Sequence, residues 1–419
     1  MEYGEFIRLG SKPAKSDLVC LFRVEPHGVS MKEACARVAS ESSVGTWTKE
    51  LSTETEAVKK RLRGLYAKAF EIKGNFVKIS YPLELWEKGN MPQILSGIAG
   101  NVFGMKAVSG LRLENIEFPE KLVKSFPGPQ FGISGVRKIF GASKRPITAT
   151  VPKPKIGLNY KEHAEAGYKA WVGGIDLLKD DENLTNQNFN SFANRVKESL
   201  KKRDMAEKET GERKSYLINI TAETTEMLRR AKIVSDAGGE YIMIDIITAG
   251  FASFQTVRDE CDDLGLAIHC HRAMHAAFDR SPKHGISMLA ISKITRLIGG
   301  DQLHTGTANI GKLESVGDET QVINKFLRGK WFNVKTVFPV ASGGIHPGII
   351  PEVMDVLGND IIIQCGGGLW GHRGGYISGA RAMRQAIDAA TQGYSLEEYA
   401  KNHAEIREAL DQWGHSKPV

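Results

Sequence analysis

The sequence predicts an α/β protein in which a small α+β domain with a ferredoxin-like arrangement precedes a (β/α)8 TIM barrel. Three observations lead to this fold class. The chain has 419 residues, which is enough for two domains. From about residue 140 onward, short β-branched runs alternate with helical patterns, and nearly every run ends in a polar or glycine-rich cluster. Residues 1 to about 125 mix strand and helix signals without this rhythm.

The N-terminal part of the chain carries the signals of the smaller domain. Its strand-like and helical runs, in chain order, are 18–26, 31–42, 76–82 and 91–104. Segment 119–132 is rich in proline and glycine, which favours a linker. We therefore predict an N-terminal α+β domain at 1–125 and a barrel domain with C-terminal helices at 126–419.

The rest of the chain contains eight strand candidates, spaced roughly 25 to 40 residues apart as in a (β/α)8 barrel. They are 146–155, 173–183, 216–224, 241–250, 266–275, 301–307, 336–344 and 360–368. Amphipathic helical patterns such as 225–238 and 379–393 lie between them, and the second ends on a glycine suited to a helix C-cap. The active site of such a barrel is built at the C-terminal ends of its strands, where the polar clusters fall.

Composition narrows the class of ligand. The net charge is +7, yet the lysines and arginines are spread out and no basic, aromatic-interleaved tract indicates nucleic-acid binding. The 44 glycines favour small anionic substrates, since glycine lets backbone N–H groups approach phosphate.

No run is long and apolar enough to span a membrane and no secretory leader opens the chain, so we expect a cytoplasmic protein. The five cysteines include no CxxC pair, which indicates reduced thiols.

The second strand candidate ends in an unusual cluster of charges, Lys179, Asp180, Asp181 and Glu182. Asp181 and Glu182 are hard oxygen ligands suited to Mg²⁺. Strand alternation places Lys179 on the same side as Asp181, and a lysine that took up CO2 would become a carbamate and a third oxygen ligand. A solvated loop or an ion-pair network would explain the same four residues without a metal.

Basic residues follow two other strand candidates. Lys153 and Lys155 end the first, and Lys312 lies in a glycine-flanked loop after the sixth. Taken one at a time these are ordinary surface lysines, but all three fall at positions predicted to face the site. Ser342, Gly343 and Gly344 end the seventh strand, and Gly366 to Gly368 end the eighth, which is the recurrent phosphate-binding position of this fold.

Histidines gather at the fifth strand candidate, in HCHRAMH. His269 and His271 have a spacing typical of metal ligands, while a mixture of core and surface histidines remains the plain alternative. Arg272 is suited to bidentate phosphate recognition. His275 follows in the same motif, and His304 ends the sixth strand.

Together these motifs resemble the large-subunit family of ribulose-1,5-bisphosphate carboxylases, RuBisCO. The matching segments are ESSVGTWT, GNVFGMKAVSGLRLE, KPKIGL, GGIDLLKDDEN, HRAMHAAFDR, HTGT, GKLE, VASGGIHPG and QCGGG. VPKPK and the C-terminal EEYAKNHAEIREALDQWGH look most like the archaeal form III branch. The resemblance covers nearly the whole chain.

The resemblance implies a function. Such enzymes add CO2, or O2, to the Mg²⁺-bound enediolate of ribulose-1,5-bisphosphate and form 3-phosphoglycerate. Form III resemblance implies a role in nucleotide (AMP) salvage. It further implies a homodimer, or an assembly of dimers, with active sites shared between subunits and without a small subunit.

The resemblance also implies residue roles in the chemistry. Lys179 matches the lysine that CO2 carbamylates, and its carbamate joins Asp181 and Glu182 on Mg²⁺ and removes the C3 proton. Lys153 matches the lysine that protonates the carbanion late in the cycle, with Lys155 supporting it. His271 matches a proton-transfer residue of the hydration and cleavage steps. Lys312 matches the lid lysine that positions CO2.

Further matches concern the two phosphates and the partner subunit. Those for one phosphate are Arg272, His304 and Ser342, and those for the other are Thr46, Trp47, Gly344, Gly366 and Gly367, with Gly343 in the same loop. Glu41 and Asn101 match residues that the N-terminal domain of one subunit lends to its partner's site.

Two departures and two alternatives remain open. Arg373 stands where the family commonly has proline, and segment 314–334 is short for the family, which leaves lid behaviour and catalytic rate in question. A RuBisCO-like enolase or isomerase of sulfur-sugar salvage is the nearest alternative, but such relatives lose several of the lysines and phosphate ligands that this chain keeps. A metal-dependent barrel hydrolase could instead use HCHRAMH and Asp245, with Zn²⁺ on histidines rather than Mg²⁺ at 179–182.

Overall fold

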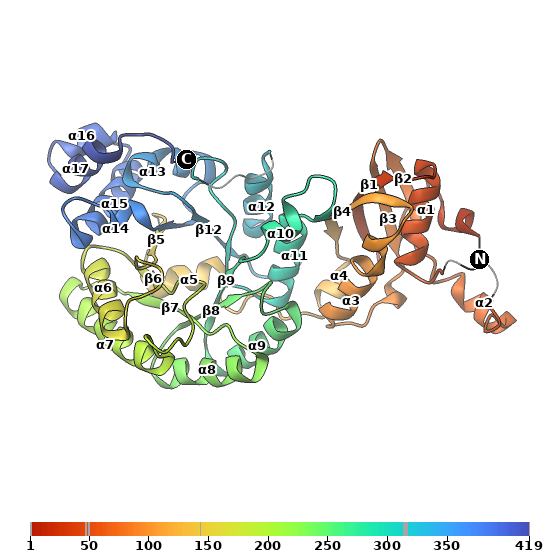
Figure 1. Ribbon diagram of the computed structural model, residues 1–419, viewed down its shortest axis with the longest axis horizontal. Coiled ribbons are helices and arrows are strands. Elements are labelled where there is room, and N and C mark those ends of the chain that lie inside the picture. Colours follow the sequence, from red (N-terminus) through yellow and green to blue (C-terminus); the bar gives the residue numbers. More distant parts are fainter. Residues whose placement is uncertain (1, 47, 49–50, 143, 313–316, 419) are drawn as a thin grey trace. The chain divides into compact units, whose positions relative to one another are not determined.

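The computed structural model describes residues 2–46, 48, 51–142, 144–312 and 317–418 (Figure 1). Trp47, one of the predicted site residues, lies outside this range. The chain divides into two compact units. The first comprises 1–127, 274–298 and 332–334, and the second comprises 128–273, 299–331 and 335–419. The predicted domain ranges, 1–125 and 126–419, stay a proposal about the sequence, since each compact unit is discontinuous in it.

A five-stranded mixed sheet forms the centre of the first unit, in the order β10-β4-β1-β3-β2. Strands β1 (Leu18–Pro26), β2 (Lys68–Lys73), β3 (Phe76–Tyr81) and β4 (Val108–Glu117) pair antiparallel. With helices α1 (Met31–Glu41) and α3 (Met91–Ile98) between them, they form the βαββαβ sequence of a ferredoxin-like fold, as predicted. Both helices start at side-chain caps, because Ser30 accepts from the Glu33 N–H and Asn90 accepts from the Gln93 N–H.

Two features of the first unit differ from the sequence prediction. Part of the proposed linker is helical, since α4 (Glu120–Val123) lies inside segment 119–132. The edge strand β10 (Gly285–Ile286) comes from a distant part of the chain and pairs parallel with β4 at Arg112 and Leu113. Helices α10 (Ala276–Asp279) and α11 (Met288–Ile298) flank this strand in the chain. The remaining short helices of the unit are η1 (Tyr3–Phe6), α2 (Glu56–Leu62), η2 (Leu83–Leu85) and η3 (Asn101–Gly104).

The second unit is a closed barrel of eight parallel strands, and all eight strands predicted from the sequence are present. In barrel order they are β5 (Ile147–Thr150), β6 (Leu177–Lys179), β7 (Ser215–Asn219), β8 (Tyr241–Asp245), β9 (Ala267–His271), β11 (Gln302–His304), β12 (Phe338–Ser342) and β13 (Ile362–Cys365). Residues on both faces of β7 and β8 are buried, because parallel strands are covered on one face by helices and fill the barrel with the other.

Helices surround the barrel strands (Figure 1). They are α5 (Gly132–Phe140), α6 (Tyr160–Val172), α7 (Phe192–Thr210), α8 (Thr224–Asp236), α9 (Phe251–Leu264), α12 (Glu319–Arg328), η4 (Pro347–Ile349), α13 (Ile350–Leu357), α14 (Gly367–Trp370), α15 (Tyr376–Gln392), α16 (Leu396–Ala400) and α17 (Ala404–Trp413). Helix α15 ends as predicted at Gly393, which takes a left-handed conformation with φ of 79°. Among the described residues, no helix is long and apolar enough to cross a membrane.

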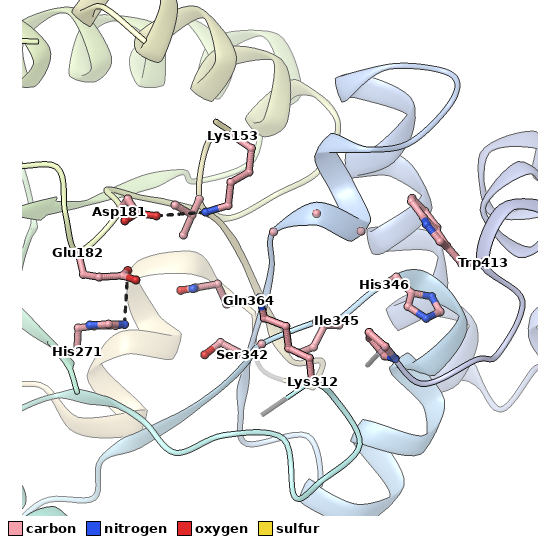
Figure 2. A pocket seen from close by; sticks show the side chains of 17 residues that line it. Lys153, Asp181, Glu182, His271, Lys312, Ser342, Ile345, His346, Gln364 and Trp413 are labelled. Atoms are coloured by element: carbon pink, nitrogen blue, oxygen red, sulfur yellow. Dashed lines mark hydrogen bonds and ion pairs between the residues drawn. The ribbon is translucent and has the colours of Figure 1, made fainter. Parts of the chain in front are cut away.

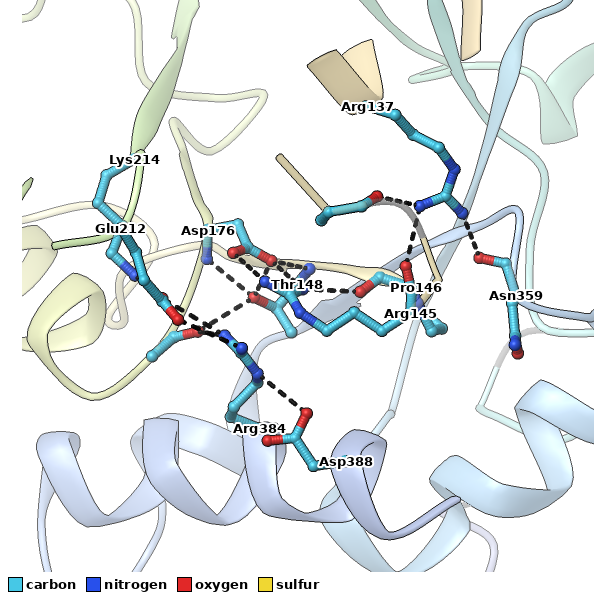
Figure 3. A network of polar contacts seen from close by, with 12 residues as sticks. Arg137, Arg145, Pro146, Thr148, Asp176, Glu212, Lys214, Asn359, Arg384 and Asp388 are labelled. Atoms are coloured by element: carbon cyan, nitrogen blue, oxygen red, sulfur yellow. Dashed lines mark hydrogen bonds and ion pairs between the residues drawn. The ribbon is translucent and has the colours of Figure 1, made fainter. Parts of the chain in front are cut away.

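A network of buried charges closes the N-terminal ends of the barrel strands (Figure 3). The two Nη atoms of Arg145 donate hydrogen bonds of 2.7 and 2.8 Å to the Asp176 carboxylate. Asp176 also accepts a hydrogen bond from the Thr148 N–H at 2.8 Å. Lys214, whose side chain is fully buried, donates to Glu212 at 2.8 Å. Each of these groups precedes or begins a strand, so the network ties the starts of β5, β6 and β7 together.

Candidate active site

A cavity of about 570 Å³ opens at the opposite end of the barrel strands, where the sequence placed the site (Figure 2). Residues at or after the ends of β5, β6, β9, β11, β12 and β13 line it, together with two from the C-terminal segment. The lining comprises Val151, Lys153, Asp181, Glu182, His271, Lys312, Ser342, Gly343, Gly344, Ile345, His346, Gln364, Gly366, Gly367, Gly368, Trp413 and Pro418. Ten of these are predicted site residues.

The charged turn after β6 contributes both carboxylates of the cavity. Lys179 ends the strand and is fully buried, with its Nζ 2.8 Å from the Asp180 carbonyl oxygen and 3.3 Å from Glu182 Oε2. Asp181 Oδ2 lies 3.2 Å from Lys153 Nζ. Burial acts to raise the pKa of Glu182, but the charges of Lys179 and then His271 outweigh it and lower that pKa to about 2. Two lysines therefore each lie beside a carboxylate at the edge of the cavity, Lys153 beside Asp181 and Lys179 beside Glu182.

Asp180 points away from the cavity and anchors the turn. It accepts hydrogen bonds from the Tyr216 hydroxyl, from the Asn219 N–H at 3.0 Å and from Arg195, whose Nη2 lies 3.2 Å away. His163 Nε2 lies 3.2 Å from the same carboxylate. Although burial opposes ionisation, the nearby Arg195 lowers the pKa of Asp180 to about 2. The ion-pair network considered from the sequence is therefore real for Asp180, while Asp181 and Glu182 face the cavity.

His271 stands between two carboxylates. Its Nδ1 lies 3.0 Å from Asp245 Oδ1, and its Nε2 lies 3.6 Å from Glu182 Oε2. Asp245 ends β8 and is 4% exposed, so its contact with Nδ1 fixes the orientation of the imidazole ring. Figure 2 shows the ring aimed at Glu182 across the cavity. The histidine is thus placed to exchange a proton at the carboxylate cluster.

Other predicted residues lie behind or beside the cavity. His304 ends β11, is buried, and has its Nδ1 2.8 Å from Ser342 Oγ, so it reaches the cavity through that serine. Arg272 follows His271 and is half-buried outside the lining. Lys155 is exposed and is also outside the lining.

The glycines in the loops after β12 and β13 let Lys312 and Lys153 pack closely against the backbone of these loops. Gly344 has φ of +77°, and a Cβ there would lie 2.9 Å from the Lys312 backbone nitrogen. The Lys312 N–H donates to the Gly343 carbonyl at 3.1 Å, which fixes the start of the lysine's loop. A Cβ on Gly366 would lie 3.5 Å from Lys153 Cε. Close packing around the lysines explains why small residues stand at these positions.

Three predicted residues belong to the first unit. Glu41 ends α1, Thr46 follows it, and Asn101 begins η3. The described residues that line the cavity all come from the second unit.

Several lining residues were not predicted. Gln364 precedes the glycine loop on β13 and could have been found from its register, because it is two residues before Gly366. His346, Trp413 and Pro418 come from a loop and from the C-terminal segment. The His346 ring receives this segment, with its Nε2 2.9 Å from the Ser416 carbonyl oxygen. No local sequence signal indicates such a contact between parts of the chain 70 residues apart.

Comparison with known proteins gives consistent matches over the whole chain. The family model for the ribulose bisphosphate carboxylase large chain, catalytic domain, matches residues 132–413, and that for the N-terminal domain matches residues 5–122. The ribulose bisphosphate carboxylase of Pyrococcus abyssi (strain GE5 / Orsay) is 51% identical over 416 residues, covering 99% of this chain and 98% of its own. That of Methanocaldococcus jannaschii is 47% identical over 432 residues, covering 98% of this chain and 100% of its own.

Solved structures give the same result. The octameric ribulose-1,5-bisphosphate carboxylase/oxygenase from Pyrococcus horikoshii OT3, crystallised as a complex with sulfate ion, superposes with a TM-score of 0.95 at 50% identity. The match covers 100% of this chain and 98% of that one. The dimeric archaeal Rubisco from Hyperthermus butylicus superposes with a TM-score of 0.93 at 47% identity, covering 99% of this chain and 100% of the other.

Proposed function

The chain belongs to the ribulose bisphosphate carboxylase large-chain family, and from this membership we propose that it adds CO2, in competition with O2, to ribulose-1,5-bisphosphate and forms 3-phosphoglycerate. The relatives compared above are named as carboxylases rather than as isomerases or hydrolases. The observation that carries the proposal is one cavity that brings Lys153 and Lys312 together with Asp181 and Glu182. A cytoplasmic role in nucleotide salvage is part of the same proposal.

Magnesium is supported by the chemistry of the donor set. Asp181 and Glu182 offer hard carboxylate oxygens to one cavity. Within the described part of the chain, no group of three or more His, Cys, Asp or Glu side chains is arranged to hold a metal ion. A third ligand would therefore come from another residue type. Lys179, 3.3 Å from Glu182, would supply an oxygen once carbamylated.

Carbamylation converts the lysine from a cation to an anion. The ammonium first loses a proton, the nitrogen lone pair then forms an N–C bond to CO2, and a second proton leaves the nitrogen. The product is an N-carboxylate next to Glu182, and a divalent cation would offset the two negative charges. When bound, the cation supplies electrostatic stabilisation for negative charge that develops on the substrate oxygens.

The protein's own groups carry the proton transfers. The Lys179 carbamate takes the proton from C3 of the substrate. Lys153 returns a proton to the carbanion late in the cycle, with Lys155 in support. His271 exchanges protons during hydration and cleavage, and the Asp245 carboxylate, 3.0 Å from its Nδ1, orients the ring. Lys312 positions CO2 from the loop that follows β11.

Two groups of residues bind the phosphates at the ends of the substrate. The glycine loops at 343–344 and 366–367 bind one phosphate, and their backbone N–H groups donate hydrogen bonds to it. The family resemblance assigns the other phosphate to Arg272, His304 and Ser342. Of these, Ser342 lines the cavity, and His304 lies behind it with its Nδ1 2.8 Å from Ser342 Oγ. Thr46 and Trp47, or their counterparts from a partner subunit, complete the first set.

A labelled-substrate assay tests the proposed reaction. The purified protein is preincubated with Mg²⁺ and CO2, given ribulose-1,5-bisphosphate and ¹⁴C-bicarbonate, and 3-phosphoglycerate is measured. Acid-stable label should appear in 3-phosphoglycerate, and omission of the preincubation should delay its appearance. Conversion of substrate to an isomer without incorporation of label would overturn the proposal in favour of the isomerase alternative.

We further propose a dimer with shared active sites. Glu41 and Asn101 resemble residues that complete a partner's site, and the compared structures include a dimeric and an octameric protein. In that arrangement the smallest active unit is a two-fold dimer with two composite sites.

Complementation tests the shared site. Two inactive variants, Glu41→Gln and Lys179→Ala, are produced together with different tags, and mixed dimers are isolated. Random pairing makes about half of the dimers mixed, and each mixed dimer has one intact site, so the unfractionated pool should regain about a quarter of wild-type activity. Isolated mixed dimers that remain inactive would show that each subunit builds its own site.

A further inference from the structure

Asn219 lies directly behind the charged turn that carries the two cavity carboxylates. It ends β7, is fully buried, and is outside the lining of the cavity. Its backbone N–H donates to Asp180 Oδ2 at 3.0 Å. Its side-chain Nδ2 lies 3.3 Å from the Asp181 carbonyl oxygen and 3.2 Å from the Glu182 carbonyl oxygen. This one residue therefore contacts three consecutive residues of the turn.

These contacts begin where the regular pairing of β6 with β7 stops. The Asp180 N–H still donates to the Leu217 carbonyl at 3.0 Å, as in a parallel ladder. The Asn219 N–H would next donate to the Asp180 carbonyl, but it donates to the Asp180 carboxylate instead. The Asn219 amide then binds the carbonyls of Asp181 and Glu182. A side chain thus continues the connection between the two strands after the backbone ladder has ended.

The orientation of the Asn219 amide is fixed by its other end. Its Oδ1 accepts from the Thr221 N–H at 3.0 Å, and Thr221 Oγ1 accepts in turn from the Asp245 N–H at 3.0 Å. A backbone N–H can only donate and a carbonyl can only accept, so the reversed amide would lose all of these contacts. The donor end of Asn219 is therefore committed to the turn.

The two carbonyls that Asn219 holds belong to the residues whose carboxylates line the cavity, Asp181 and Glu182. Holding the backbone of both residues sets the points from which the two side chains start. Magnesium accepts oxygen ligands only in a near-octahedral arrangement at about 2.0–2.1 Å, so small shifts of these starting points matter. Groups that hold the ligands of a metal from behind therefore contribute to its affinity.

We propose that Asn219 is a positioning residue of the metal site, which holds the backbone of Asp181 and Glu182 so that both carboxylates reach one divalent cation. The inference rests on the proposed function for the presence of the metal and of the Lys179 carbamate. Asn219 is not itself a ligand, because it is buried outside the cavity lining. A purely structural asparagine would contribute to stability and leave the affinity for the metal unchanged.

Binding of Mn²⁺ tests this role without any catalytic turnover. The protein is equilibrated with excess bicarbonate and no sugar bisphosphate, and titrated with Mn²⁺, whose free form is measured by electron paramagnetic resonance. Asn219→Leu has a similar volume and no polar group. Its dissociation constant for Mn²⁺ should rise about 10- to 100-fold, the usual effect of losing a group that orients metal ligands.

Thr148→Val is the matched control at the opposite end of the barrel. Thr148 is also fully buried, and its Oγ1 donates to Asp176 Oδ2 at 2.9 Å and accepts from the Asp176 N–H at 2.8 Å. Each variant thus removes buried hydrogen bonds made by one strand residue of the barrel. Denaturant titration should show lower stability in both variants, whereas the affinity for Mn²⁺ should fall in Asn219→Leu alone.

The outcomes separate the inference from the proposed function. Unchanged affinity for Mn²⁺ in Asn219→Leu, or an equal loss in Thr148→Val, would overturn the inference while the wild type still binds the metal. A wild type that binds no Mn²⁺ would overturn the proposed metal site, and the inference with it. If Asn219→Leu does not fold, Asn219→Ala is measured in its place, with a weaker affinity for Mn²⁺ expected and the same overturning results.

Discussion

The two ends of the barrel contain the same kinds of residue and use them differently. At the N-terminal end, the buried Asp176 is held by Arg145, and the fully buried Lys214 pairs with Glu212 (Figure 3). At the C-terminal end, the fully buried Lys179 lies beside Glu182, whose side chain is one-third exposed. Glu182 borders the cavity (Figure 2). A buried lysine with a carboxylate is therefore not by itself a sign of function. What separates the two ends is whether the carboxylate lines a cavity that a ligand can enter, as Asp181 and Glu182 do.

The details of the two aspartates illustrate this difference. Asp176 is held by both Arg145 Nη atoms and by the Thr148 N–H and hydroxyl, at 2.7 to 2.9 Å. Asp181 accepts from Asn183 on one oxygen and from Lys153 at 3.2 Å on the other. The Lys153 side chain is 36% exposed and can move away. A metal could replace Lys153 at Asp181, whereas loss of Arg145 would leave the Asp176 carboxylate, 2% exposed, without its charge partner.

The largest expected effect comes from exchanging each buried lysine for arginine. Lys179→Arg should lose activity by at least about a thousandfold, because a guanidinium cannot form the carbamate and catalytic electrostatic groups carry effects of this order. Lys214→Arg is the matched control at the opposite end and should keep kcat/KM. The measurement is the rate of CO2 incorporation after activation with Mg²⁺ and CO2. Similar losses in both variants would mean that the comparison between the two ends is wrong.

Next in size is the loss of stability when the N-terminal network is broken. Asp176→Asn should lower the free energy of unfolding by about 3–5 kcal/mol, since it breaks a pair whose carboxylate side chain is 2% exposed and leaves the mostly buried Arg145 without its charge partner. Asp181→Asn should lose activity with a much smaller change in stability, because Lys153 can reach water. Denaturant titration of both variants measures the difference. Asp360→Asn breaks a pair with Arg137 in which the carboxylate is 52% exposed, and should cost only about 0–1 kcal/mol.

The third prediction separates two steps of the reaction, removal of the C3 proton and addition of CO2. Lys312→Ala should reduce CO2 incorporation by about two to three orders of magnitude, the scale of losing a positioned charge at a reaction centre. Exchange of the C3 proton of ribulose-1,5-bisphosphate with solvent should persist, because it depends on the Lys179 cluster rather than on the loop. Tritium release from C3-labelled substrate measures this exchange. Parallel loss of both activities would place Lys312 in the proton-abstraction step.

A smaller effect is expected from the glycine that supports Lys312. Gly344→Ala places a Cβ 2.9 Å from the Lys312 backbone nitrogen at a φ of +77°, so the lysine must shift. We expect kcat/KM to fall about 10- to 100-fold, since displacements of about 1 Å have effects of this size. Gly265→Ala has a similar φ of +65° with no atom within 4 Å of the new Cβ, and should affect stability alone. Equal activity in the two variants would exclude the contact as the cause.

The smallest effect is a pH dependence at the N-terminal network. Burial acts to raise the pKa of Asp176, but its hydrogen bond and charge interaction with Arg145 outweigh burial and hold that pKa below the usual 3.8. A carboxyl whose pKa is lower in the folded state stabilises the fold fully above its unfolded pKa of about 3.9, and this contribution is lost as the pH falls through the folded pKa. The stability difference between wild type and Asp176→Asn should therefore shrink as the pH falls from 5.5 to below about 4. Denaturant titrations at several pH values measure it, and a difference that grows on acidification would contradict the assignment.

The sequence was most informative about the strands and their ends. All eight barrel strands were predictable because buried parallel strands give short apolar runs, and their polar ends marked the cavity. Asp176 lies inside such a run and was not recognised as a charged group in its own right, because nothing local shows that Arg145 would meet it. Strand β10 has only two residues and exists through its pairing with β4, so a local pattern could not predict it.

The site was predictable in part for the same reason. Asp181, Glu182 and His271 follow from strand register, whereas His346 contacts the C-terminal segment at Ser416, which is 70 residues away in the chain. Trp413 and Pro418 reach the cavity through contacts of the C-terminal segment, which sequence periodicity does not encode. The parts of a site that depend on one element are readable from sequence, and those that depend on two distant elements are not.

The segment 274–298, which carries β10 and belongs to the first unit, has a consequence for biosynthesis. The polypeptide passes between the two compact units after residues 127, 273, 298, 331 and 334. The first unit therefore lacks its edge strand and α11 until residue 298 has left the ribosome, by which time five barrel strands have already been synthesised. The N-terminal unit cannot finish folding before these barrel strands have been synthesised. The order of folding therefore differs from the usual one, in which the N-terminal domain folds first. A nascent chain stalled before residue 285 would expose the β4 edge to other chains, which makes this interval the point at which chaperone binding would be of most use.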